Sequence, residues 1–324
     1  MQIWNNLPVL VCLGAVLLPC LVYLWLGLGE RILARLGAGT ARVLRPWFWL
    51  SLPLAVVALV LVYPLVVTIW LALRNNRSTE WVGLRNFQWA FSGEMIQVMG
   101  NSLLWLVALP LGTIVLSLVA AVLFDRVKYE KLAITIILLP TAISFTAASI
   151  IWRQLYSYQP ADAPQVALLN AIWMGLGASE PVAWLQTPVL NSICLIVVAL
   201  WASVGVATLI VSAGVKNVPA ELREAALIDG AGEWRIFFLI TLPQIVPAIL
   251  VVLTTSAVFA LKVFDIVYIM TNGQYGTDVV ANRMYSELFT ANNAARASAI
   301  AVLLLIAAIP IALANLRLWE RVGK

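Results

Sequence analysis

The chain has 324 residues, of which 63% are hydrophobic and only 11% are charged. Soluble domains average roughly 45–50% apolar and 25% charged residues, so this composition excludes a soluble globular protein and predicts an integral membrane protein. The sequence has no histidine, which is the commonest proton shuttle and metal ligand. A net charge of +5 indicates basic loops on one side of a membrane rather than nucleic-acid binding.

Seven apolar runs are long enough to cross a bilayer, which takes about 20 apolar residues per helix. They are residues 7–29, 48–72, 101–124, 132–152, 190–213, 245–270 and 297–316. The first run has neither a basic leading segment nor a cleavage site, and we interpret it as a retained transmembrane helix. Segment 30–47 is rich in Arg, Gly and Ala and is interpreted as a cytoplasmic linker. The sequence therefore predicts an all-α membrane protein with an added helix in 1–47 and a six-span core in 48–324.

Lysine and arginine are unevenly divided among the segments between these runs. Thirteen lie in one alternating set, namely 30–47, 125–131, 214–244 and the C-terminal tail. Six lie in the other set, namely 73–100, 153–189 and 271–296. Because basic residues collect on the cytoplasmic side, we expect the first set in the cytoplasm. The N-terminus is then periplasmic and the C-terminus cytoplasmic.

Segment 214–244 is polar and amphipathic, although it lies between two apolar runs. A helix that begins near Ala220 would carry Glu221 in its first turn, where the helix dipole favours acidic residues. Gly230 is suited to end that helix, because glycine accepts a left-handed conformation without steric cost. We therefore expect a short helix with a small-residue face. Its candidate docking residues are Glu224, Ala225, Ala226, Asp229, Gly230 and Ala231.

These residues resemble the EAA loop of the membrane-spanning subunits of ABC importers, since Ile240, Leu242 and Pro243 also follow at that loop's spacing. In that family the loop is a short helix that docks on a cytoplasmic ATPase and transmits its movement. From about Trp81 onward the chain is similar to carbohydrate-uptake permeases of the type I importer group, whose periplasmic GLxNF segment matches residues 83–87. The chain resembles one subgroup most, the α-glucoside permeases, which include the glucosylglycerol permeases of cyanobacteria. This likeness lies in segments 138–158, 168–177, 180–188 and 261–277.

The resemblance implies partners that composition does not reveal. They are a second permease subunit in a heterodimer, two cytoplasmic ATPase subunits and an extracytoplasmic sugar-binding protein. The location implied is the bacterial inner membrane. ATP and Mg would be used by the ATPases, and this chain, which has no GxxxxGK[ST] segment, would bind no cofactor. The implied substrate is an α-glucoside such as glucosylglycerol, sucrose or trehalose, carried by alternating access.

Lys262 and Asp265 are the only Asp, Glu, Lys or Arg residues within the seven runs. Charges at membrane depth usually face a cavity or a partner. A spacing of three residues places both on one helix face, close enough to pair. Phe264, Tyr268 and Asn272 lie nearby and supply aromatic and hydrogen-bonding groups. We predict that these five residues line the substrate pathway, while an internal ion pair that only joins helices stays an open alternative.

Three other functions fit the same residues less well. A secondary transporter driven by an ion gradient tends to have inverted repeats and several intramembrane acids, whereas only Asp265 lies within a run. A membrane enzyme lacks candidate chemistry, because the three cysteines lie in apolar runs and no metal-ligand spacing occurs. A channel subunit would leave the docking segment without a purpose.

Overall fold

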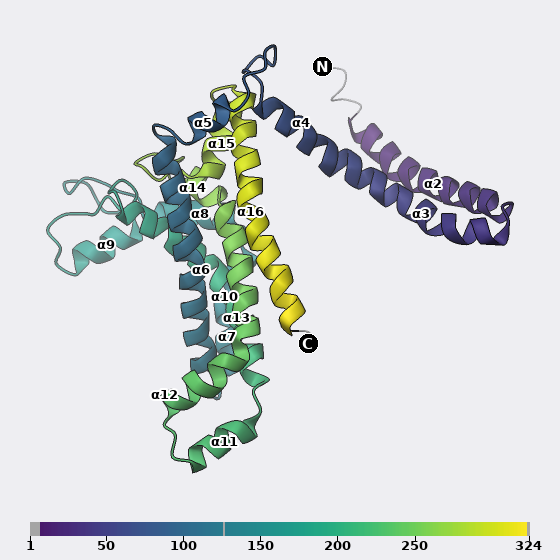
Figure 1. The fold of residues 1–324 in the computed structure, drawn as a ribbon. Helices are drawn as coiled ribbons and strands as arrows, with labels where there is room; N and C mark the ends of the chain where they lie inside the picture. Colours follow the sequence, from purple (N-terminus) through teal and green to yellow (C-terminus); the bar gives the residue numbers. More distant parts are fainter. Residues whose placement is uncertain (1–6, 126, 323–324) are drawn as a thin grey trace. The chain divides into compact units, whose positions relative to one another are not determined.

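The computed structural model describes residues 7–125 and 127–322, which form helices and, within that part of the chain, no β-sheet. Figure 1 traces these helices from purple at the N-terminus to yellow at the C-terminus. Internal contacts divide the chain into two units, Met1–Val67 and Thr68–Lys324. The all-α fold is as predicted. The contact boundary follows Val67, well beyond residue 47, because the helix after the expected linker packs against the first helix.

The first unit is a helical hairpin. Its helices α2 (Leu7–Ala34) and α3 (Ala38–Val57) are joined by a turn at residues 35–37. The rings of Trp25 and Phe48 stack between them with centroids 5.6 Å apart. Segment 30–47, expected as a linker, is therefore helical apart from the turn. Its arginines, leucines and alanines are good helix formers, which explains the difference.

Two helices contain a wide π turn that ends two residues before a proline. η1 (Ala58–Val62) joins α3 to α4 (Tyr63–Ala72), and η3 (Phe237–Thr241) joins α12 (Glu233–Ile236) to α13 (Leu242–Leu261). Pro64 and Pro243 each stand two residues after such a turn. Proline has no N–H to donate to a carbonyl one turn earlier, and a π turn accommodates the missing bond without ending the helix. Gly39–Ala72 thus remains one continuous helix, apolar enough to span a membrane.

The core of the second unit is a bundle of α6 (Met95–Asp125), α10 (Leu190–Lys216) and α13, which pack against one another (Figure 1). α16 (Ala294–Val322) packs along α13. Each of the four has an apolar stretch long enough to cross a membrane. Their buried contact includes Trp105, Leu109, Leu195 and Val198. The predicted spans 101–124, 190–213 and 297–316 are confirmed as helices of this bundle.

Short helices lie at both ends of the bundle (Figure 1). α11 (Ala220–Ile228) and α12 lie at one end, which we call the α11 end. α5 (Arg85–Ala90) and α15 (Val280–Phe289) lie at the other end, and both pack against α16. The long loop before α10 carries α9 (Leu168–Gly175). Fully buried Asn170 holds this loop by bonding to the backbone of Val182 and accepting a hydrogen bond from the Trp184 indole at 3.0 Å.

Two of the predicted spans are interrupted. Run 132–152 consists of α7 (Glu130–Leu138), the 3-10 turn η2 (Leu139–Ala142) and α8 (Phe145–Leu155), with a bend of 96° between the helical parts. Pro140 lies in η2, and the Ser144 hydroxyl accepts a hydrogen bond from the Ala147 N–H to start α8. Run 245–270 ends as a helix at Leu261, and α14 (Asp265–Met270) follows after a break. The span predicted at 132–152 is corrected to a broken one, and the span predicted at 245–270 is corrected to the membrane-length helix Glu233–Leu261, which ends before α14.

Candidate functional site

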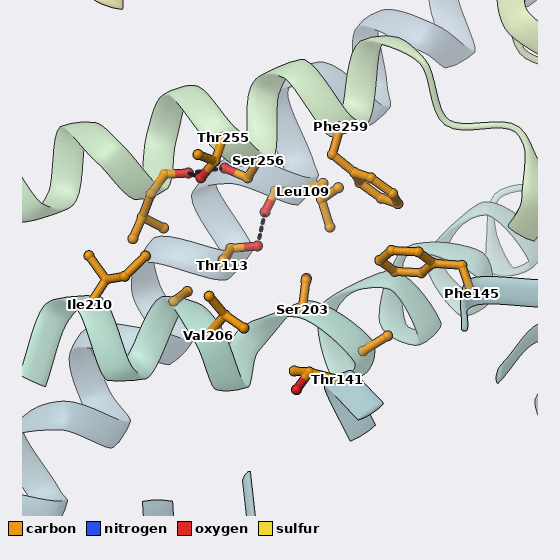
Figure 2. A pocket seen from close by; sticks show the side chains of 13 residues that line it. Leu109, Thr113, Thr141, Phe145, Ser203, Val206, Ile210, Thr255, Ser256 and Phe259 are labelled. Carbon is orange, nitrogen blue, oxygen red and sulfur yellow. Dashed lines mark hydrogen bonds between the residues drawn. The ribbon is translucent and has the colours of Figure 1, made fainter. Parts of the chain in front are cut away.

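A cavity of about 310 Å³ lies among α6, α10 and α13, and Thr141 and Phe145 contribute to its wall from the bent segment. Figure 2 shows the side chains of α13 on one side of this space and those of α10 on the other, with Thr113 of α6 between them. We call this space the inner cavity. It exists because three helices distant in sequence carry small polar side chains where they meet.

The polar atoms of the inner cavity are hydroxyl oxygens. Thr113, Ser203, Thr255 and Ser256 each donate the hydroxyl hydrogen to the backbone carbonyl four residues earlier, over 2.5 to 2.8 Å. A hydroxyl that has donated its hydrogen still has lone pairs with which to accept. The cavity wall therefore offers hydrogen-bond acceptors to a ligand that carries hydroxyl donors.

The inner cavity carries no charge, because none of its 13 lining residues is ionisable. Phe145 and Phe259 lie together at one edge of it (Figure 2). Their ring centroids are 4.5 Å apart and the rings are nearly parallel, at 29°. An apolar stacked pair beside uncharged hydroxyls suits an uncharged polar solute, and a charged solute would find no counterion among these residues.

A second cavity of about 390 Å³, the outer cavity, lies further along α8 and α14. Its wall is rich in phenols and amides, including Tyr156, Tyr158, Gln186, Tyr268 and Asn272. The one cation among its lining residues is Arg153, whose guanidinium donates to the carbonyl of Ile269 at 3.2 Å. Aromatic faces and hydrogen-bonding groups together are the chemistry that binds sugar rings and their hydroxyls.

The predicted pathway residues are distributed unevenly around the two cavities. Tyr268 and Asn272 line the outer cavity, and Phe264 stacks on Tyr268 with centroids 5.0 Å apart. Lys262 and Asp265 line neither cavity and are exposed. Whether these five residues meet substrate stays a prediction.

The expected pairing of Lys262 with Asp265 on one helix face is wrong. The helix ends at Leu261, and the backbone leaves the helical region at Phe264, so the two side chains belong to different helices. Lys262 stands at the C-terminus of α13 and Asp265 in the first turn of α14, where the helix dipoles favour a cation and an anion respectively. Within the described chain, Asp265 instead accepts a long hydrogen bond of 3.5 Å from the Thr146 hydroxyl.

Phe264 and Tyr268 continue into an aromatic group with Tyr285 of α15, whose ring lies 5.0 Å from each of theirs. The Tyr268 hydroxyl raises the pKa of Tyr285 by hydrogen bonding. A tyrosine is protonated at physiological pH in any case, and the raised pKa keeps the Tyr285 phenol neutral to still higher pH. These contacts hold the start of α14 next to the outer cavity.

The α11 helix ends as the sequence predicts. Gly230 has a left-handed φ of +78°. Its N–H donates to the Leu227 carbonyl at 3.0 Å, and the Ala231 N–H donates to the Ala226 carbonyl at 2.9 Å. These two bonds form the Schellman arrangement that closes a helix at a glycine. Asp229 is the C-terminal cap of the helix.

The surface of α11 is open, since none of its residues is buried. Glu224 and Ala225 are exposed, as are Leu227 and, most of all, Ile228 at 86%. Such apolar exposure on a short polar helix is typical of a docking surface. Two ion pairs hold its base: Arg223 lies 3.7 Å from Asp125 at the end of α6, and Lys216 pairs with Glu130 of α7. The role of the predicted docking residues stays a prediction.

Sequence analysis did not single out Thr113, Ser203 or Ser256, nor the two ion pairs below α11. A weak signal existed, because isolated hydroxyl residues interrupt otherwise apolar runs. The same signal marks Thr208, which is fully buried and bonds only to its own helix, at the Val204 carbonyl. Which hydroxyls meet at a cavity depends on how the helices are rotated against one another. The sequence of a single apolar run does not predict that rotation.

Comparison with known proteins assigns the chain to a family. The model for the "Binding-protein-dependent transport system inner membrane component" matches residues 31–318. The osmoprotective compounds uptake permease protein GgtC of Synechocystis is 45% identical over 261 residues, which cover 80% of this chain and 93% of GgtC. The alpha-glucoside transport system permease protein AglF of Rhizobium meliloti is 42% identical over 279 residues, which cover 86% of this chain and 83% of AglF.

Solved structures agree on the fold. A chain of a bacterial ABC transporter that imports the acidic polysaccharide alginate superposes with a TM-score of 0.73 at 22% identity, and the match covers 88% of this chain and 99% of that chain. A structure of a bacterial alginate ABC transporter in complex with an alginate pentasaccharide-bound periplasmic protein gives the same score.

Proposed function

Because the chain belongs to the family of binding-protein-dependent transport system inner membrane components, we propose that its two cavities carry an uncharged carbohydrate or sugar-derived osmolyte across the membrane. The chain is the permease subunit of an ATP-driven ABC importer of sugars in the inner membrane, and such subunits are not themselves enzymes. One observation supports the uncharged substrate: the inner cavity is lined by hydroxyl acceptors and by no ionisable residue.

The substrate class follows from that chemistry together with the relatives. GgtC is described as a permease for osmoprotective compounds and AglF as one for alpha-glucosides. A neutral α-glucoside such as glucosylglycerol, sucrose or trehalose has many hydroxyl donors and no charge. It therefore matches a wall of acceptor oxygens better than an acidic sugar does.

The working assembly that we propose has four other components. They are a second permease subunit, two ATPases that use ATP and Mg, and an extracytoplasmic sugar-binding protein. The α11 end faces the cytoplasm, which places the C-terminus in the cytoplasm and the N-terminus in the periplasm, as the basic residues favour. The exposed α11, with no buried residue in this chain, would then meet an ATPase.

Transport follows alternating access in this proposal. ATP binding closes the ATPase pair and moves α11, and the ion pair from Arg223 of α11 to Asp125 of α6 passes the movement into the bundle. The pair of Lys216 with Glu130 ties the end of α10 to α7 beside it. Sugar enters the outer cavity beside Tyr268 and Asn272, passes Phe145 and Phe259, and reaches the inner cavity. Membership of the family favours this ATP-driven mechanism over an ion-gradient transporter.

The test is uptake of labelled glucosylglycerol, sucrose and trehalose by proteoliposomes that hold the complete transporter, its binding protein and internal ATP with Mg. Replacing Thr113 by Val keeps the side-chain volume and removes one cavity acceptor. Loss of one hydrogen bond of about 1 kcal/mol predicts uptake lowered about fivefold. Ser203→Ala should have a similar effect.

The matched control is Thr208→Val. Thr208 lies on the same helix as Ser203 and donates to its own helix at 2.8 Å, but it does not line the cavity. Its replacement should leave uptake near the wild-type value. Equal uptake by the Thr113→Val and Thr208→Val transporters would refute the cavity assignment, and uptake of none of the three neutral sugars would refute the substrate class.

A further inference from the structure

Four arginines gather around the turn of the α2–α3 hairpin, a segment that the transport mechanism does not use. They are Arg31, Arg35, Arg42 and Arg45. The only acidic residue among the first 79 is Glu30. This patch therefore has a net charge of +3 within about four helical turns, and nothing in residues 1–79 neutralises it.

Glu30 already pairs with Arg45 and with Trp49. Its carboxylate lies 3.1 Å from the Arg45 guanidinium and accepts a hydrogen bond from the Trp49 indole at 2.8 Å. Arg31, Arg35 and Arg42 are exposed, and none of them makes a side-chain hydrogen bond or ion pair within the part of the chain that is described. Three guanidinium groups of the patch thus have unused hydrogen-bond donors, and the patch contains no free carboxylate to accept from them.

A cavity of about 570 Å³ opens beside these arginines, between the end of α2 and the start of α3. Arg42 and Arg45 supply charged groups to its wall, while Leu33, Leu36 and Pro46 form an apolar part. Such a combination fits a ligand with a phosphate at one end and a hydrocarbon chain at the other. A guanidinium binds a phosphate through two parallel N–H donors.

The depth of the patch along the helix matches the depth of lipid headgroups in a bilayer. The membrane-spanning helix that contains α3 begins at Gly39. At 1.5 Å per residue, Arg42 lies about 5 Å and Arg45 about 9 Å along the helix from that point. The headgroup layer of a bilayer is roughly 5–8 Å thick on each side. With Gly39 taken at the membrane surface, Arg42 lies within this layer and Arg45 at about its inner edge.

We infer that the α2–α3 turn is a binding site for the phosphate of an anionic phospholipid, with Arg42 as its main ligand and Arg45 as a shared one. A lipid with net negative charge is favoured over a zwitterionic one, because the patch charge of +3 would repel a headgroup ammonium. The inference depends on the hairpin lying in a membrane and not on the identity of the transported sugar.

Native mass spectrometry of the assembled transporter tests the site. The probes are dioleoyl phosphatidylglycerol and dioleoyl phosphatidylcholine, which share acyl chains and differ in headgroup charge. The wild type should retain phosphatidylglycerol in preference. Arg42→Gln should weaken that retention about fivefold, the effect expected of one basic residue near a charged membrane surface, and Arg42→Lys should restore part of it.

Arg77→Gln is the matched control, because Arg77 is also exposed but lies far from the hairpin in sequence, outside the cavity. It should retain phosphatidylglycerol as the wild type does. Equal loss in the Arg42→Gln and Arg77→Gln transporters, or equal retention of the two lipids, would overturn the site. Competition by added inorganic phosphate would assign it to a free anion and overturn the lipid. ATP-driven uptake by Arg42→Gln confirms that the variant is assembled.

Discussion

Single residues set how closely the helices of the bundle approach. Gly205 of α10 lies against the backbone where α7 meets η2. A Cβ atom there would stand 2.3 Å from the Ile137 carbonyl oxygen and 2.9 Å from the Leu138 Cα. Both are backbone atoms, so no side-chain rotation relieves the contact. Small residues allow this kind of close helix packing in membranes.

Gly205→Ala should therefore destabilise the transporter. Overpacking of a tight contact costs on the order of 1–3 kcal/mol, and we expect the thermal unfolding midpoint of the purified complex to fall by several degrees. Gly100→Ala is the control, because Gly100 lies inside α6 and its added Cβ would meet nothing within 4 Å. Equal midpoints for the two variants would contradict the close approach.

At the scale of elements, charged residues stand where helices end. Lys262 and Asp265 flank the break between α13 and α14. Helix α11 ends at Gly230, where two backbone hydrogen bonds close it. Breaks and stops of this kind give an element a defined length and direction. For α11 they determine which of its residues an ATPase would meet.

The stop at Gly230 can be tested without touching any contact, since an added Cβ there meets nothing within 4 Å. The left-handed φ of +78° costs a side-chain-bearing residue roughly 1–2 kcal/mol, and more for a β-branched one. Gly230→Val should distort the end of α11 and lower ATP-driven uptake at least fivefold while the complex still assembles. Uptake in proteoliposomes measures this.

Gly232→Val serves as the comparison. Gly232 has φ −72° and an extended ψ, which a β-branched residue accepts, and it too has open space around it. Its uptake should stay close to that of the wild type. If both valine variants transported normally, the turn at Gly230 would have no part in coupling.

At the scale of the whole molecule, two cavities follow one another along the second unit. Phe145 at the start of α8 belongs to the inner cavity, and Arg153 of the same helix belongs to the outer one. On the other side, Phe259 of α13 lines the inner cavity and Tyr268 of α14 the outer one. The stacked rings of Phe145 and Phe259 therefore lie on the inner-cavity side of the route from the outer cavity to the inner cavity.

Phe259→Ala should open that passage. We expect faster efflux of a preloaded labelled sugar from proteoliposomes without ATP, and weaker coupling of uptake to ATP hydrolysis. Phe238→Ala removes a half-exposed ring at the α11 end, remote from both cavities, and should not leak. Tight vesicles from the Phe259→Ala protein would show that the pair is no barrier.

The sequence by itself determined the properties that depend on neighbouring residues. Apolar runs such as 48–72, 101–124 and 190–213 fall within membrane-length helices, because the lipid exposure of a helix depends on local composition. Glu221 and Gly230 marked the two ends of α11 because a helix dipole and a left-handed turn act within a few residues. The break in run 132–152, with its angle of 96°, was not predicted, although Pro140 lies at it.

The tertiary structure alone decided what distant segments do together. Val263, in the interruption after Leu261, and Ile266, just beyond it, are buried in the core, and no helical periodicity reveals that burial. The inner cavity needs hydroxyls of α6, α10 and α13 to point at one space, and the ion pair from Arg223 to Asp125 joins residues almost a hundred positions apart. Rotation and packing of whole helices fix these contacts, because they depend on the complete set of neighbours around each helix rather than on any one segment.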